Sequence, residues 1–135
     1  MHNLYLTSNF ASIFKIIYLL LSFRVEYFRG SPVMRLVFKM NDKINEKKLN
    51  RNVRSHGNFS EYVPLFLVLL LILEIKDVIP FLFLLTTCIF FSYGRVAHAI
   101  CFSFYEFNPF LRMSGMLCTY IGLGILSFFL IYQLS

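Results

Sequence analysis

The sequence contains no tryptophan and few acidic residues, with seven Asp and Glu against thirteen Lys and Arg. Without Trp, any belt of aromatic side chains at a membrane surface must come from Tyr and Phe. The three cysteines, Cys88, Cys101 and Cys118, form no Cys-x-x-Cys pair, so we interpret them as small buried hydrophobic residues. Internal repeats, low-complexity tracts and glycine-rich phosphate loops are also missing. The sequence therefore gives no sign of a metal centre or of a phosphate-binding loop.

Apolar residues dominate what the sequence does contain. Hydrophobic residues make up 58% of its 135 residues, and the mean hydropathy is +0.67. A typical soluble domain is about 45–50% apolar. A chain of this length has too high a ratio of surface to volume to hide so much apolar surface from water. We therefore predict an integral membrane protein whose outer surface faces lipid.

Positive charge is concentrated in one region, because nine of the thirteen Lys and Arg lie between Arg24 and Arg54. Nucleic-acid binding is a weak explanation, since the basic stretch is short and is bounded by apolar runs. The excess of Lys and Arg in the cytoplasmic loops of membrane proteins explains it better. We expect this loop to be cytoplasmic, with both termini and the Lys76-Asp77 turn on the other side of the membrane.

Four apolar segments are each long enough to cross a hydrocarbon core of about 30 Å. They predict transmembrane helices over residues 4–28, 45–75, 78–105 and 110–134 of one domain that covers residues 1–135. Lys15 interrupts the first segment and no small-residue cleavage site follows it, so we interpret it as a retained helix rather than a signal peptide. Asn41-Asp42 predicts a turn, and Pro80 is expected in the first turn of the third helix. Short connections predict an all-α, up-down four-helix bundle.

We interpret several glycines and acidic residues as structural. Gly115, Gly122 and Gly124 on the fourth helix form no Gly-x-x-x-Gly pair, and we expect them to permit close helix packing. Glu74 and Asp77 are expected to cap the far end of the second helix and its turn. None of these residues indicates a catalytic or ligand-binding role.

Polar residues gather where the second predicted helix approaches the cytoplasm. One stripe on a helix is formed by residues that are three, four and three positions apart: Arg51, Arg54, Asn58 and Glu61. His56 follows Arg54 by two positions, which is about 200° around the helix. His56 is therefore expected to face a different neighbour or a different subunit.

A second polar cluster lies on the third predicted helix, where Arg95 and His98 are neighbours at positions i and i+3. Tyr105 lies on the same side of this helix. Because the second and third helices are antiparallel, Arg95 is expected at about the depth of Glu61. Arg112 begins the fourth helix at the same membrane face. Ionisable residues within a membrane are costly and usually have a partner.

The residues alone leave three explanations of these clusters open. In the first, an Arg95–Glu61 ion pair only fixes the packing of two helices. In the second, the surplus of cations binds an anion, either a small ligand with carboxylates or a thiolate, or the headgroup of a lipid. In the third, Arg95 and Glu61 form a relay in a small transporter or channel, which four helices without a repeat make the least favoured.

Two sequence motifs resemble a known family. The pattern Arg-x-His-x-Asn-x-x-Glu-Tyr-x-Pro is filled by Arg54 to Pro64, and Gly94 to His98 read Gly-Arg-Val-Ala-His. These resemble the helix-2 and helix-3 motifs of the MAPEG family, the membrane-associated proteins in eicosanoid and glutathione metabolism. The second motif is similar to that of the prostaglandin E synthase branch. The resemblance extends over almost the whole chain.

The resemblance implies a homotrimer that binds glutathione as co-substrate at each subunit interface, near the cytoplasmic side. It implies that glutathione is contacted by Arg54, Asn58, Glu61 and Tyr62, with Glu61 at the α-amino group and the arginines at the carboxylates. Further candidate positions in the pocket are Arg51, His56, Arg95, His98 and Tyr105. Arg112 is the expected stabiliser of the glutathione thiolate, with Arg24 or Arg29 assisting from the first helix.

Three features depart from the family pattern. Phe102 stands where the family often has a tyrosine, and Tyr105 lies nearly a turn further on. Pro109 lies in the turn before Arg112, and the loop between the first two helices lacks the Gly-Asp-Gly turn of the bacterial branch. Two functions are therefore expected: a glutathione-dependent transferase or peroxidase for hydrophobic electrophiles, or a non-catalytic membrane protein that binds glutathione or an anionic lipid.

Overall fold

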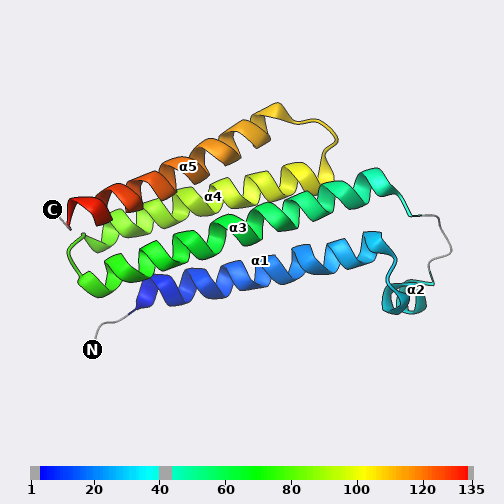
Figure 1. Cartoon of the computed structure of the whole chain (residues 1–135), viewed down its shortest axis with the longest axis horizontal. Helices are drawn as coiled ribbons and strands as arrows, with labels where there is room; N and C mark the ends of the chain where they lie inside the picture. Colours follow the sequence, from blue (N-terminus) through cyan, green and yellow to red (C-terminus); the bar gives the residue numbers. More distant parts are fainter. Residues whose placement is uncertain (1–3, 40–43, 134–135) are drawn as a thin grey trace.

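A computed structural model describes residues 4–39 and 44–133, and these form five helices. The helices are α1 (Tyr5–Arg29), α2 (Pro32–Phe38), α3 (Glu46–Lys76), α4 (Phe81–Phe104) and α5 (Pro109–Tyr132). All but α2 are long and apolar enough to cross a membrane. The four long helices lie side by side, and each runs antiparallel to the next (Figure 1). The chain is thus an all-helical, multi-pass membrane protein, as predicted.

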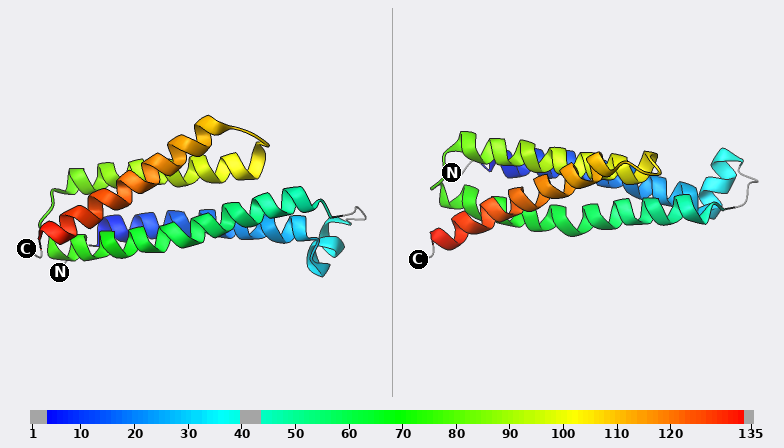
Figure 2. Two further views of the ribbon diagram at one scale, coloured as in Figure 1. Left: turned by 45° about the horizontal axis from the view of Figure 1, so that its top comes forward. Right: turned by 90° about the horizontal axis from the view of Figure 1, so that it is seen from above.

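The long helices pack in two layers, α1 with α3 and α4 with α5 (Figure 2). The contact between α4 and α5 is the most extensive, and α3 touches all three other long helices. We call the end where α1 stops, α3 starts and α4 joins α5 the basic end of the bundle. At the opposite end, called the far end, α1 begins and α3 turns into α4 (Figure 1).

Local signals in the sequence explain where the helices start and stop. Gly30 ends α1 in the left-handed conformation (φ 63°), which glycine adopts without steric cost. Asn45 is the N-cap of α3 and Asn108 is the N-cap of α5. Each side chain accepts a hydrogen bond from a backbone N–H in the first turn of its helix. These polar caps satisfy amides that have no partner within the helix.

Two boundaries differ from the sequence prediction. The third long helix begins at Phe81 rather than at residue 78, because a residue before proline avoids the helical conformation and Pro80 itself serves as the N-cap. The stretch after Arg29, expected to be polar and irregular, contains the short helix α2, which begins with Pro32 at its first position. The predicted Asn41-Asp42 turn and the predicted end at residue 134 lie outside the described residues.

Phenylalanines form the centre of the core. Phe66 stacks on Phe91 with ring centroids 3.8 Å apart, and Phe14 meets Phe91 and Phe59 edge to face at 5.9 and 6.0 Å. All four rings are buried. The edge-to-face contacts of Phe14 suit the charge distribution of aromatic rings.

Two polar contacts fix α1 against its neighbours. At the far end, the Glu74 carboxylate accepts hydrogen bonds from the backbone N–H groups of Leu6 and Thr7, at 2.7 and 2.9 Å. Glu74 therefore caps the start of α1, not the end of its own helix as the sequence suggested. Near the basic end, Arg24 donates from Nε to Asn52 Oδ1 at 2.8 Å and from Nη2 to the Ser103 carbonyl at 2.7 Å. Together these contacts set the register of α1 along α3.

Candidate functional site

A pocket of about 440 Å³ opens at the basic end, between the start of α3, the end of α4 and the start of α5. It is lined by Arg51, Arg54, Cys101, Phe102, Tyr105, Glu106, Phe107, Asn108, Pro109, Arg112 and Met113. Its volume falls within the range of small-molecule sites, which is about 300–1,000 Å³. Four of the residues predicted from the sequence, Arg51, Arg54, Tyr105 and Arg112, thus line one cavity.

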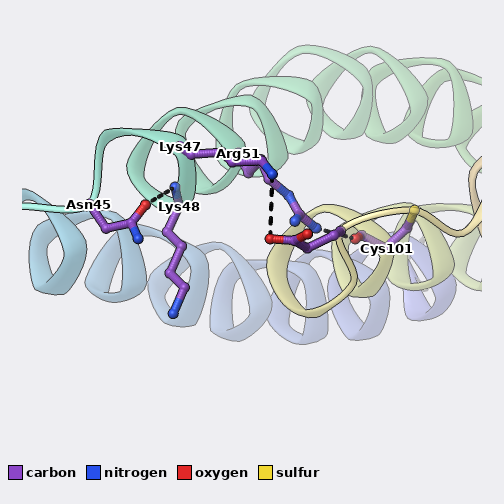
Figure 3. A network of polar contacts seen from close by, with 6 residues as sticks. Asn45, Lys47, Lys48, Arg51 and Cys101 are labelled. Atoms are coloured by element: carbon purple, nitrogen blue, oxygen red, sulfur yellow. Dashed lines mark hydrogen bonds and ion pairs between the residues drawn. The ribbon is translucent and has the colours of Figure 1, made fainter.

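Contacts between α3 and the end of α4 hold the wall of this pocket in place (Figure 3). Arg51 donates from Nη2 to the carbonyl of Cys101 at 3.2 Å, and Lys47 Nζ lies 3.5 Å from Glu106 Oε1. The Cys101 Sγ lies 3.3 Å from the Asn108 carbonyl, across the turn that leads into α5. The arginines of α3 and α5 are therefore brought together by the end of α4.

The pocket carries an excess of positive charge. Three guanidinium groups line it, from Arg51, Arg54 and Arg112, against one carboxylate, that of Glu106. Glu106 is already paired with Lys47, and both side chains are largely exposed. No group of three or more His, Cys, Asp or Glu within the described ranges is placed to hold a metal ion. The charge of this pocket suits an anionic ligand with more than one acceptor group.

Arg112 lies beside an aromatic ring rather than beside a carboxylate. Its guanidinium carbon is 5.6 Å from the centroid of the Phe102 ring. The same ring stacks with His98, with centroids 4.7 Å apart. Phe102 occupies the position where a tyrosine was expected, so this ring offers contact but no hydroxyl group.

Arg95 is buried at 2% exposure, and its partners are neutral groups. It donates from Nε to Thr119 Oγ1 at 2.9 Å and from Nη1 to the Asn58 carbonyl at 3.1 Å, and it lies 4.9 Å from the Tyr62 ring centroid. Neither ion pair within the described parts of the chain involves Arg95 or Glu61. The Arg95–Glu61 ion pair considered from the sequence is therefore wrong for a single copy of the chain.

The rest of the α3 stripe lies outside the pocket. The Asn58 side chain donates to the Arg54 carbonyl at 2.9 Å, and the hydroxyls of Tyr62 and Tyr120 are 3.4 Å apart. The Glu61 side chain is exposed, and the described residues give it no hydrogen-bond partner. One copy of the chain thus gathers the arginines of the stripe but leaves Glu61 on the outer face of α3.

A model of the MAPEG family matches residues 8–132 of the chain, which is nearly its whole length. The chain belongs to the MAPEG family. No curated protein and no solved structure matches the sequence. The family consists of membrane-associated proteins in eicosanoid and glutathione metabolism, so a link to glutathione holds at the level of the family.

Three other residues that the MAPEG resemblance singled out, His56, His98 and Arg29, lie away from the pocket. The ring of His56 lies tilted against that of Tyr18 in α1, with centroids 4.7 Å apart, on the opposite side of α3 from the arginine stripe, as its spacing predicted. His98 is buried between α4 and α5, and within the described residues neither His56 Nε2 nor His98 Nδ1 has a hydrogen-bond partner. Arg29 pairs with Glu26 at 3.2 Å in an exposed position. These side chains do not line the basic pocket.

Arg24 lines a different cavity of about 570 Å³, between α1 and α4. Its guanidinium lies 4.1 Å from the centroid of Phe104 and 5.3 Å from that of Phe28. The remaining lining is mostly aliphatic and aromatic. The described residues therefore give this MAPEG chain two cavities at its basic end, one with several cations and one largely apolar.

Sequence reasoning missed the residues that hold Arg95 and Arg24 in place. Thr119 accepts from Arg95 and in turn donates to the Gly115 carbonyl at 2.7 Å, and Asn52 accepts from Arg24. A threonine or asparagine inside a long helix carries no signal that separates a partner of a buried cation from an ordinary back-bonded side chain. Tyr120, which pairs with Tyr62, likewise carries no signal that separates it from the other aromatic residues of its apolar segment.

Proposed function

We propose that this MAPEG protein is a glutathione-dependent transferase or peroxidase of the membrane, acting on hydrophobic electrophiles as a homotrimer. The family assignment supports a role for glutathione. The observation that carries the proposal is the pocket at the basic end, where Arg51, Arg54 and Arg112 meet around a single carboxylate that is already paired. Glutathione has two carboxylates and an ionisable thiol, so its charge complements such a pocket.

In the proposed complex each group of glutathione has a complementary partner. Arg51 and Arg54 bind carboxylates, and the Glu61 carboxylate takes the α-ammonium group, with Asn58 and Tyr62 completing the contacts. Tyr105 lines the pocket beside the arginines, whereas His56 packs against Tyr18 of α1 on the other side of α3. Arg95 and His98 are buried behind this layer, so we assign them the task of holding Asn58, Tyr62 and Phe102 in position.

Arg112 supplies the proposed chemistry. A cysteine thiol with a pKa of about 8.5 is mostly protonated at neutral pH, and a nearby guanidinium lowers that pKa. The thiolate donates its electron pair to the electrophilic carbon, forming a C–S bond. The bond from that carbon to its leaving group breaks, and the leaving group departs with the bonding electrons. Membrane lipid delivers the apolar substrate, so no water-filled path is needed.

Glutathione conjugation by the purified protein in nanodiscs tests this assignment. With a chlorodinitrobenzene as electrophile, Arg112→Ala should lower kcat/KM about 100-fold, the effect of removing one group that stabilises developing negative charge. The ultraviolet absorbance of the bound thiolate should then require a higher pH than in the wild-type protein. Glu61→Gln should mainly raise the KM for glutathione.

Arg35→Ala provides the matched control, because Arg35 is an exposed arginine of α2 at the same end of the bundle and does not line the pocket. Its conjugation rate should equal that of the wild type. If Arg112→Ala and Glu61→Gln leave a measurable rate unchanged, the assignment of the site is wrong.

One observation favours the alternative, a non-catalytic protein that binds glutathione or an anionic lipid. Arg112 packs near the ring of Phe102, which has no hydroxyl group to donate to a thiolate. In that case glutathione would raise the melting temperature in a saturable manner, yet no electrophile would be conjugated. Introducing the hydroxyl with Phe102→Tyr would separate the two functions. An increase in conjugation would indicate a catalytic site, whereas continued binding without conjugation would indicate the non-catalytic protein.

A further inference from the structure

Lys15 is a cation in the middle of a transmembrane helix. It lies in α1 and is exposed on the surface of the bundle. Its ammonium group lies 5.1 Å from the centroid of the Tyr18 ring, and the ion pairs among the described residues do not include it. A charged side chain at the centre of a bilayer costs several kcal/mol, so it normally has a partner.

Glu61 on α3 is an acidic side chain that likewise lacks a partner of opposite charge. Its carboxylate is exposed and has no ion-pair or hydrogen-bond partner in the part of the chain that the structure describes. It directly precedes the apolar stretch that begins at Tyr62 and reaches Ile75. Lys15 and Glu61 are thus a cation and an anion on the outer face of the bundle that have no ion-pair partner among the described residues.

The two charges lie at nearly the same depth. The Leu6–Glu74 contact and the Arg24–Asn52 contact tie α1 to α3 at two levels. Lys15 is midway in sequence between Leu6 and Arg24, and Val63 is midway between Asn52 and Glu74. Lys15 therefore lies at the level of Val63, only two positions from Glu61, or about 3 Å along the helix.

The lining of a groove between α1 and α3 agrees with this register. Lys15 shares this groove of about 340 Å³ with Ser60, directly before Glu61, and with Pro64, three residues after it. Ser60 and Pro64 face α1, whereas Glu61 is turned about 100° from Ser60 around α3 and does not line the groove. Within one chain the two charges are thus level with each other but point in different directions.

The surface around Lys15 has the composition of a helix contact. Four small residues lie on the same side of α1 as Lys15, beside the larger and exposed Leu19: Ser8, Ala11, Ser12 and Ser22. Ser8 and Ser12 are exposed, and the Ser12 hydroxyl bonds back to the Ser8 carbonyl at 2.8 Å. Small residues allow two helices to approach closely in lipid. A face that touches only lipid would not need them, because large apolar side chains make that contact equally well.

We infer that Lys15 of one copy of the chain pairs with Glu61 of a second copy, across an interface within the membrane. The two faces differ, so the contact is heterologous and closes into a ring when the rotation between copies permits. The inference rests on the self-assembly in the proposed function and not on catalysis. A carboxylate has two oxygens and accepts several hydrogen bonds, so Glu61 has room for both Lys15 and a ligand ammonium group.

Cross-linking between two tagged chains tests the pairing directly. Chains carrying Lys15→Cys under one tag and Glu61→Cys under another are co-expressed and treated in the membrane with a short bis-thiosulfonate reagent. A covalent dimer that carries both tags is expected. Ile16→Cys replaces Lys15→Cys in the matched control, because Ile16 is exposed but turned about 100° away, and that pair should give a weak band. The native cysteines are buried and set the background.

Charge exchange provides the second readout, measured by native mass spectrometry. Lys15→Glu and Glu61→Lys should each shift the protein towards monomer, and the double exchange should restore the oligomer. An oligomer without the mixed dimer would overturn the pairing while leaving assembly intact. A cross-link confined to a single chain with both cysteines would overturn it as well. A wild-type protein that is monomeric throughout would remove the pairing together with the proposed trimer, whereas loss of conjugation alone would bear only on the catalytic proposal.

Discussion

Charged side chains in this membrane protein are held by neutral groups more than by opposite charges. Arg95 is bound by a threonine hydroxyl, a backbone carbonyl and a tyrosine ring, and Arg24 by an asparagine, a carbonyl and two phenylalanine rings. Such partners satisfy donors without requiring a second charge to be moved from water into lipid. The position of Arg95 inside an apolar segment showed that it needs a partner, but its expected depth suggested Glu61, because side-chain direction across two helices cannot be read from one sequence.

Glu74 carries a prediction about stability at this scale. Glu74→Ala should lower the free energy of unfolding by about 1–3 kcal/mol, because the first amides of α1 lose a charged acceptor in a partly buried position. Reversible unfolding in mixed micelles, followed by circular dichroism, would measure the loss. Asp77→Asn is the matched control, since Asp77 is an exposed acid near the same end and asparagine tolerates its left-handed backbone. Equal losses in the two variants would contradict the capping role of Glu74.

At the scale of the elements, the sequence located the four long helices but not the details of their contacts. Apolar length and cap residues such as Asn45 and Asn108 mark the helices clearly, since both signals are local. The short helix α2 was missed because seven residues carry too little periodicity to separate a helix from a loop. Val33, Leu36 and Val37 of α2 are exposed. The sequence did not predict their exposure, because it does not show where α2 lies relative to the long helices.

Glycines on α5 show the same limit. All of Gly115, Gly122 and Gly124 were expected to allow close packing, and the first two do so. A Cβ on Gly115 would lie 2.9 Å from the Gly94 carbonyl oxygen, and one on Gly122 would lie 3.1 Å from Phe91 Cβ. A Cβ on Gly124 would meet nothing within 4 Å among the described residues. The sequence places each glycine on the helix but does not reveal which direction faces α4.

Gly115→Ala should destabilise the bundle by at least about 1–3 kcal/mol, because the added carbon meets backbone atoms that cannot move without separating α4 from α5. Gly124→Ala offers a control on the same helix. It should leave stability unchanged or raise it by up to about 1 kcal/mol, since alanine favours a helix more than glycine does. Thermal melting of both variants in one detergent would compare them. Similar melting temperatures would rule out the close approach at Gly115.

At the scale of the whole molecule, the candidate site was only partly foreseeable. The motif treats Arg54, Asn58 and Glu61 as one stripe, and the stripe exists, but a single chain encloses only its arginine end within the pocket. The pocket also depends on the end of α4 and the turn at Asn108, whose geometry no periodic signal specifies. The outward position of Glu61 becomes a binding position only when another surface covers it, which agrees with the proposed assembly.

Orientation in the membrane is the property of the whole molecule that follows from charge alone. The basic end holds most of the Lys and Arg, so it should lie in the cytoplasm. Lys47→Cys at the basic end and Val78→Cys at the far end both introduce exposed thiols. In intact cells or sealed vesicles of known orientation, a membrane-impermeant maleimide applied from the non-cytoplasmic side should label Val78→Cys at once and Lys47→Cys only after permeabilisation. The unaltered chain, with three buried cysteines, sets the background. The opposite pattern would place the arginine pocket on the non-cytoplasmic face, away from the cytoplasmic glutathione that the proposed reaction consumes.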